Sequence, residues 1–343
     1  MSDSQVMLAA LVLEQKYRGR MVNCINRAST LLRTLPSKVA VSTLPVWSAK
    51  GSGQLAEEYA EGADAINFGS DSQAKAILTW GKVRSNFHLS GTSRRAAALA
   101  ATPEGQDNQV IENIQDSTMA LASLINQKLY TGSGATDKVC GLATAIADDN
   151  TYATIDRTIG GNEYWQSYVV DPGSSTDLSF AQIRADQAGV RKKGGEGPDL
   201  AVCDPDTWNT VASLFDGNRQ YTQNVITTAR GTITLDAGSE AIYFNGTAFV
   251  QDKDAPAKQI LYLNTNWVHV EYLPVPADDM AQLAGMGIMV QANDGFGPIP
   301  LGFLVEKLDK SGDSDKFSMT FNGQLVVRKP SACGVRKNIA MAA

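Results

Sequence analysis

Apolar side chains between residues 102 and 131 recur with the period of an α-helix. Spacings of three and four link Ile111, Ile114, Thr118, Leu121, Ile125 and Leu129. Thr102 suits the N-cap, Pro103 the first turn, and Gly132 the C-cap. At 1.5 Å per residue this helix would be about 40 Å long. The pattern therefore predicts a spine helix whose buried stripe includes Ile111, Ile114, Leu121 and Ile125.

The sequence before the spine helix predicts a long two-stranded hairpin from Leu55 to about Leu89. Gly69–Ser72 indicates a turn, and residues 76–84 are rich in strand formers. The first limb is acidic and carries Glu57, Glu58, Glu61, Asp64 and Asp71. The returning limb is basic and carries Lys75, Lys82 and Arg84. Because isolated hairpins are marginally stable, we expect an arm that lies on a neighbouring copy. The alternative is a solvated hairpin with ordinary cross-strand charge pairs.

The first 50 residues are basic. They include Arg18, Arg20, Arg27 and Arg33, whereas their acidic residues are Asp3 and Glu14. Such a segment either binds nucleic acid or lies across an acidic neighbour. The acidic limb that follows favours the neighbour, so we predict that these arginines and the charged hairpin residues contact other subunits.

The remaining chain mixes helices and strands, which indicates an α+β fold. We expect a helix at 179–192, a strand at 200–203, a helix at 204–215 and a β-rich stretch at 233–272. Asn245-Gly246 is a strong hairpin signal. Residues 259–263 and 267–272 are predicted to pair with each other, and Asn322-Gly323 predicts a second tight hairpin near the C-terminus.

Composition narrows the class of protein. The chain has 343 residues and a formal net charge of -6, which gives no general attraction to nucleic acid. It contains no run of eighteen apolar residues, so we expect no membrane span. Its start lacks the basic and apolar regions of a secretion signal. The four cysteines are scattered, which favours buried free thiols over disulfides or zinc ligands.

Candidate chemistry is sparse. The chain has two histidines, His88 and His269, and no nucleophile motif accompanies them. No glycine-rich phosphate loop occurs, and the aspartates from Asp309 to Asp315 lack the glycine and glutamate of a calcium loop. We therefore predict no catalytic residues, cofactor or metal. An enzyme with a carboxylate-based site in 199–290 stays as an alternative, because carboxylate pairs follow no fixed spacing.

The order of these elements resembles the tailed-phage major capsid protein with the Hong Kong 97-type fold. The resemblance covers most of the chain. It includes the exit of the spine helix, where Leu129-Tyr130-Thr131-Gly132 leads to Cys140-Gly141-Leu142. It also includes Tyr152–Thr158 with Trp165-Gln166, Pro198–Trp208, and Gly323–Pro330.

The resemblance implies a division of the chain into five parts. These are an N-arm at 1–50, an extended E-loop at 51–93, a first P-domain part at 94–198 with the spine at 102–131, an A-domain at 199–297, and a second P-domain part at 298–343.

The resemblance also implies a function. Copies of the chain would form hexamers and pentamers that close an icosahedral shell around double-stranded DNA, with weak non-specific DNA contact. The expected partners are a separate scaffolding protein, a portal and decoration or cement proteins. Assembly is expected in the host cytoplasm, and the final location is the virion capsid. Some relatives crosslink an E-loop lysine, and Lys75 and Lys82 lie in that segment. An encapsulin-like compartment of the same fold is the alternative.

Overall fold

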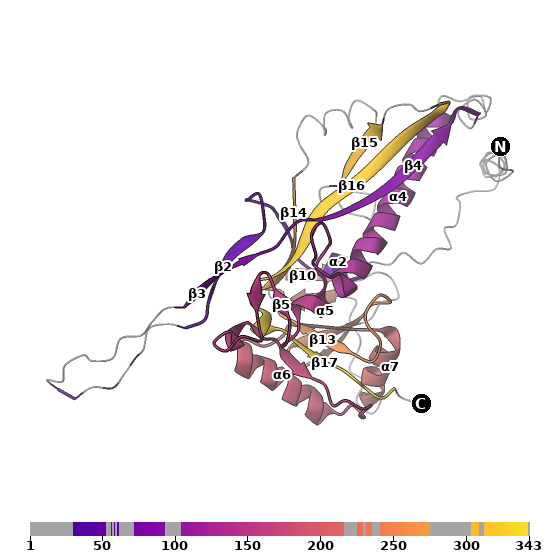
Figure 1. Cartoon of the computed structure of the whole chain (residues 1–343). Helices are drawn as coiled ribbons and strands as arrows, with labels where there is room; N and C mark the ends of the chain where they lie inside the picture. Colours follow the sequence, from indigo (N-terminus) through magenta and orange to yellow (C-terminus); the bar gives the residue numbers. More distant parts are fainter. Residues whose placement is uncertain are drawn as a thin grey trace. The chain divides into compact units, whose positions relative to one another are not determined.

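A computed structural model of the chain describes residues 30–52, 56, 58, 60–61, 72–92, 104–215, 225–228, 231–234, 241–274, 303–308 and 312–341. The fold is α+β and divides into two compact units (Figure 1). The first unit comprises Met1–Ala28, Lys82–Ile125 and Leu273–Asn322. The second comprises Ser29–Gly81, Asn126–Tyr272 and Gly323–Ala343.

The second unit is built around a six-stranded mixed sheet. Its strands follow the order β11-β12-β8-β13-β17-β7. Their bounds are β11 Ala241–Phe244, β12 Thr247–Gln251, β8 Leu200–Cys203, β13 Ile260–Leu263, β17 Gly334–Arg336 and β7 Tyr168–Val170. The central β8 runs parallel to β12 and antiparallel to β13. All four residues of β8 are buried, as expected for a strand covered on both faces.

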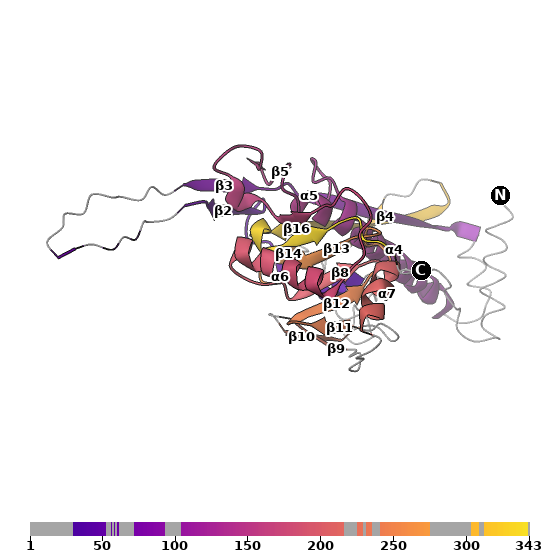
Figure 2. The ribbon, with the colours of Figure 1, turned by 90° about the horizontal axis from the view of Figure 1, so that it is seen from below.

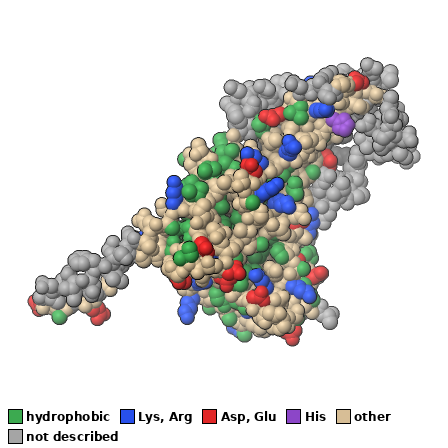
Figure 3. All heavy atoms as spheres, in the orientation of Figure 1, with side chains coloured by type: hydrophobic (Ala, Val, Ile, Leu, Met, Phe, Trp, Pro, Cys, Tyr) green, Lys and Arg blue, Asp and Glu red, His purple; other side chains and the backbone are tan. Residues whose placement is uncertain are grey.

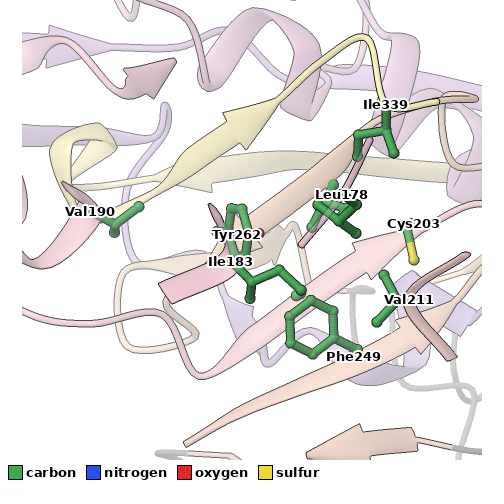
Figure 4. Close-up of a cluster of buried hydrophobic side chains, with 10 residues drawn as sticks. Leu178, Ile183, Val190, Cys203, Val211, Phe249, Tyr262 and Ile339 are labelled. Carbon is green, nitrogen blue, oxygen red and sulfur yellow. The ribbon is translucent and has the colours of Figure 1, made fainter. Parts of the chain in front are cut away.

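Two helices cover one face of this sheet. They are α6 (Phe180–Gly194) and α7 (Pro205–Leu214), and both lie over the sheet in Figure 2. Ile183 and Val190 of α6 and Val211 of α7 meet Phe249 and Tyr262 of the sheet in one buried apolar cluster (Figure 4). Burying these side chains drives the packing of helix on sheet.

The ends of the elements follow local chemistry. Ser179 and Gln182 form a reciprocal capping box at the start of α6, and Gly195 ends the helix with a φ of 79°. Asn245 and Gly246 join β11 to β12 with φ values of 51° and 85°, as a tight hairpin turn requires. Both helix predictions and the Asn245-Gly246 hairpin are therefore confirmed, with shifts of one or two residues at the helix ends.

Two strand predictions are wrong. The strands at 259–263 and 267–272 do not pair with each other, because β13 lies in the six-stranded sheet and β14 (Val268–Tyr272) lies in another, between β1 (Ser37–Val39) and β16. Asn322-Gly323 is not a turn either, because β16 runs unbroken from Ser314 to Val327. Gly323 pairs with Tyr272 there, so strand pairing overrides the local turn preference.

The first unit contains most of the spine helix. This helix, α4, extends over Glu104–Thr131, and Gly132 follows it as predicted. Within the unit, β16 pairs with β15 (Leu304–Leu308) and with β4 (Gly81–Ser90). Thr118 of α4 lies 3.5 Å (Oγ1 to Sδ) from Met319 of β16, and Leu121 and Ile125 are fully buried. The side chains of Ile111 and Ile114 lie outside the described residues, as do Thr102 and Pro103.

The structure also contains short two-stranded and helical elements. They are β9 (Val225–Thr228) with β10 (Gly231–Thr234), α5 (Leu142–Ala145) and η2 (Pro330–Ala332). Among the described residues, no helix is both long enough and apolar enough to span a bilayer.

The buried stripe of α4 gives a matched pair of substitutions. Leu121 is 1% exposed, whereas Leu124 on the same helix is 38% exposed. We expect Leu121→Asp to lower the free energy of unfolding by at least about 4 kcal/mol, because it leaves a cavity and an unpaired buried charge. Leu124→Asp should lower it by about 1 kcal/mol or less. Urea denaturation of the isolated chain measures both, and equal losses would contradict the stripe.

Candidate assembly site at the root of the arm

A two-stranded arm leaves the second unit. Its strands are β2 (Val46–Lys50) and β3 (Gln73–Ile77), which pair antiparallel from Val46 opposite Ile77 to Lys50 opposite Gln73 (Figure 1). The pairing continues one step further, because Gly51 N–H donates to the Ser72 carbonyl at 2.9 Å. The second strand of this hairpin, β3, lies within the predicted region of Leu55 to Leu89, whereas the first strand, β2, precedes that region.

The predicted limbs need three corrections. The first limb begins at Val46 instead of Leu55, and Ser72 lies on a limb instead of at the turn. The segment 76–84 is also not one strand, because β3 ends at Ile77 and β4 begins at Gly81. Within the uncharged stretch 46–49, Ala49 is buried, as is its near neighbour Ala76 on the other strand, and Trp47 is partly buried. This packing outweighs the charge pattern that suggested the later start.

The predicted contact residues that the structure describes are all exposed. They are Arg33, Glu58, Glu61, Lys75, Lys82 and Arg84. Lys75 lies on β3, whereas Lys82 and Arg84 lie on β4, so the basic residues do not share one limb. Arg18, Arg20, Arg27, Glu57, Asp64 and Asp71 lie outside the described residues. A role for these side chains in subunit contacts stays a prediction.

An aromatic cluster supports the root of the arm. Trp47 of β2 packs on Tyr152 and Trp165, with the three ring centroids 6.1 to 6.4 Å apart. These rings come from β5 (Thr151–Tyr152) and η1 (Glu163–Trp165). Trp47 Nε1 donates to the Arg328 carbonyl at 3.2 Å, and the Tyr152 hydroxyl accepts from Val327 N–H at 2.8 Å. The cluster therefore ties the first strand of the arm to the end of β16.

Arg157 organises the loops beneath this cluster. Its side chain is 1% exposed and stacks over the Tyr152 ring at 5.3 Å. The guanidinium donates to the carbonyls of Trp165 (2.9 Å), Ala145 (2.6 Å) and Thr144 (3.3 Å), and to Asn150 Oδ1 (2.5 Å). Burial lowers the pKa of Arg157 to about 10, so the group stays charged at neutral pH. One planar cation thus joins three loop segments.

A turn with unusual backbone angles contacts the other strand of the arm. Ala153 and Thr154 join β5 to β6 (Ile155–Asp156) with φ values of 50° and 68°. Left-handed backbone costs a residue with a β-carbon about 1–2 kcal/mol. The turn is held by its contacts with β3: Ile77 N–H donates to the Ala153 carbonyl at 3.0 Å, and Thr154 Oγ1 donates to the Lys75 carbonyl at 3.2 Å. Both strands of the arm are therefore fixed at the root.

The chain that leads into the arm is also held by buried polar groups. The first turn of α2 (Thr30–Thr34) donates from Leu31 N–H to Asp252 Oδ2 at 2.9 Å and from Leu32 N–H to Asn126 Oδ1 at 3.0 Å. Tyr130 donates its hydroxyl proton to Asp252 at 2.9 Å. The predicted N-arm at 1–50 therefore includes elements that belong to the folded unit, from Thr30 onward.

Trp47, Arg157 and Asp252, which hold the arm and the chain that leads into it, were not predicted from the sequence. Arg157 could have been singled out, because it lies in the segment Tyr152–Thr158, which is part of the family resemblance. Asp252 carried no such signal, because its partners on α2 and α4 are distant in sequence. The described residues hold no cluster of three metal-ligating side chains. Burial raises the pKa of Cys140 and of Cys333 to about 12, so both thiols are protonated at neutral pH.

Comparison with known families agrees with this architecture. Residues 15–340 match the model of the SU10 major capsid protein family. The chain belongs to this family. It is a phage major capsid protein with the Hong Kong 97-type fold, as the sequence predicted. Among proteins of curated function, none matches the sequence.

Several solved structures share the fold. The capsid subunit of cyanophage A-1(L) has a TM-score of 0.69 and 17% identity, over 94% of this chain and 96% of that one. The capsid of the native GTA particle has a TM-score of 0.60 and 14% identity, over 94% of each chain. The SrpI encapsulin of Synechococcus elongatus PCC 7942 has a TM-score of 0.53 and 13% identity, over 97% of this chain and 96% of that one. At such identities the likeness concerns the fold alone.

The Arg157 contacts predict a large effect on the stability of the capsid subunit. Arg157→Met removes the donor from the buried acceptors and should lower the free energy of unfolding by about 3 kcal/mol or more. Arg157→Lys should recover little of this loss, because an ammonium cannot reproduce the planar fork. Arg184 is exposed on α6, so Arg184→Met should change stability by about 0.5 kcal/mol or less. Chemical denaturation of the three variants tests this, and a tolerated Arg157→Met would refute it.

Proposed function

We propose that this capsid protein forms hexamers and pentamers that close an icosahedral shell around double-stranded DNA, with each arm laid on a neighbouring subunit. The observation that carries the proposal is the arm itself. Its strands β2 and β3 form a separate two-stranded sheet, and the firmly built root sets its direction. A ribbon of two strands is marginally stable alone, and contact with another copy supplies the missing surface.

Arm contacts of this kind suit a closed shell. A contact between different surfaces of identical subunits generates rings when the rotation closes. The exposed charges Glu58, Glu61 and Lys75 contribute register and specificity more than affinity, because exposed ion pairs are individually weak. Shell assembly is therefore expected to depend on salt.

The proposal includes further partners. A separate scaffolding protein would guide closure in the host cytoplasm, a portal would occupy one vertex, and decoration or cement proteins would cover the mature shell. The net charge of -6 suits weak, non-specific contact with packaged DNA, since like charges repel.

An encapsulin-like compartment is the second candidate. It is favoured by the fold similarity to the SrpI encapsulin, although that TM-score of 0.53 is below the 0.69 of the cyanophage subunit. The two functions differ in content: a compartment holds a protein cargo, whereas a phage shell holds DNA.

Electron microscopy of native particles, together with a nuclease-protection assay on the same sample, tests the proposal. We expect uniform icosahedral particles with hexamers and pentamers and with nuclease-resistant DNA. Particles that contain protein cargo without DNA would favour the compartment. A subunit that forms no shell, with or without a scaffold, would contradict both functions.

A shortened arm tests the role of the hairpin directly. Gly51 and Ser72 form a hydrogen-bonded pair on opposite strands of the hairpin. A two-residue Asn-Gly loop can connect two strands directly after such a pair. We expect a variant in which Asn-Gly replaces residues 52–71 to fold with an unchanged melting temperature and to form no closed shells. The full-length chain under the same conditions is the control. Normal shells from the shortened variant would show that the arm is dispensable.

A further inference from the structure

An apolar strip occurs at the entrance to the arm. Eight large hydrophobic side chains are exposed in the described part of the chain, and four of them lie within eight consecutive residues: Val39 (49%), Val41 (98%), Leu44 (37%) and Val46 (38%). We call these four residues the apolar ledge. Hydrophobic side chains are visible on the surface beside the arm in Figure 3. Scattered exposed apolar residues are ordinary, whereas a contiguous group marks an interaction surface.

The backbone of the apolar ledge is held in place from one side. Trp80 Nε1 donates to the Thr43 carbonyl at 2.7 Å, and Leu78 N–H donates to the Pro45 carbonyl at 3.0 Å. Ala40 N–H donates to the Tyr272 carbonyl at 2.8 Å, which extends the pairing of β1 with β14. A surface fixed in this way loses little conformational entropy when a partner binds.

The ledge is also uncharged. No Asp, Glu, Lys or Arg occurs from Val39 to Val46, although Lys38 and Lys50 flank the segment. An acidic or nucleic-acid partner would find no charge to pair with on the ledge itself. Its chemistry fits an apolar protein surface.

We propose that the apolar ledge docks a second copy of this capsid protein, and that this contact stabilises the assembled shell. The inference rests on the proposed function. Among described strands, β1 pairs only with β14, so the strand that leads into the ledge is an edge strand of its sheet. A neighbour reached by the arm approaches the root of that arm, where the ledge lies. Apolar burial there supplies the affinity that the exposed charges of the arm do not.

Charge substitution on the apolar ledge tests the contact. Val41 is 98% exposed in the subunit, so Val41→Asp should leave its melting temperature unchanged. It should raise the subunit concentration needed for half-maximal assembly by at least about tenfold, measured by light scattering and microscopy. Val41→Leu should assemble normally. The control is Ala185→Asp, which adds the same charge at an exposed position of α6 and should also assemble normally.

The other outcomes overturn the proposal. Normal assembly of Val41→Asp would refute the ledge and leave the proposed function intact, whereas a wild-type chain that never assembles would remove both. Equal impairment by Ala185→Asp would show that any added charge disturbs assembly. A lower melting temperature of the unassembled Val41→Asp subunit would show that the ledge is covered within its own chain.

A photocrosslinker identifies the partner directly. Benzoyl-phenylalanine at position 41 of the full chain, irradiated in assembled particles, should give a product of twice the subunit mass. A crosslink to a scaffolding or decoration protein instead would assign the ledge to that partner and overturn the proposal.

Discussion

The guanidinium of Arg157 holds together the loops on which the direction of the arm depends. It donates hydrogen bonds to carbonyls on both sides of the β5–β6 hairpin, and that hairpin contacts β3 through Ala153 and Thr154. A ribbon of two strands has no interior that could set its own course. Its orientation is therefore decided where it leaves the folded unit, by a buried cation and an aromatic cluster. In the proposed assembly, a root fixed by these contacts is what would let a neighbour meet the arm in the same way at every subunit.

A second buried network has the same effect on the chain that enters the arm. Asp252 accepts hydrogen bonds from the backbone of α2 and from Asn126 and Tyr130 of α4. Such satisfied polar groups specify one arrangement of the elements they join, whereas apolar packing tolerates several. The network thus fixes the C-terminal part of the spine helix, α2 and the end of β12 against one another within a single chain.

Local signals predicted the parts of the fold whose cause is local. The spine helix, the capping box at Ser179 and the Asn245-Gly246 turn each depend on residues within a few positions of one another. The predicted turn at Asn322-Gly323 is wrong because Gly323 pairs with Tyr272 of β14, and that strand lies far away in the sequence. The bounds of the hairpin limbs were predicted wrongly for a related reason. Val46–Lys50 lacks the run of charged residues on which that prediction rested, and its partner strand lies more than twenty residues away. Arg157 and Asp252 act through distant carbonyls and amides, which leave no pattern along the chain.

In the proposed assembly, charge and apolar surface act on the free subunits over different distances. The uncharged ledge from Val39 to Val46 is flanked by Lys38 and Lys50, and the chain as a whole carries a net charge of -6. Free subunits therefore repel one another at long range, although salt screens this repulsion. Apolar contact at the proposed ledge would act at short range and repeat at every subunit of a closed shell, so its free energy would accumulate with each added copy. Because each such contact is weak by itself, a wrongly placed subunit could leave before the shell closes.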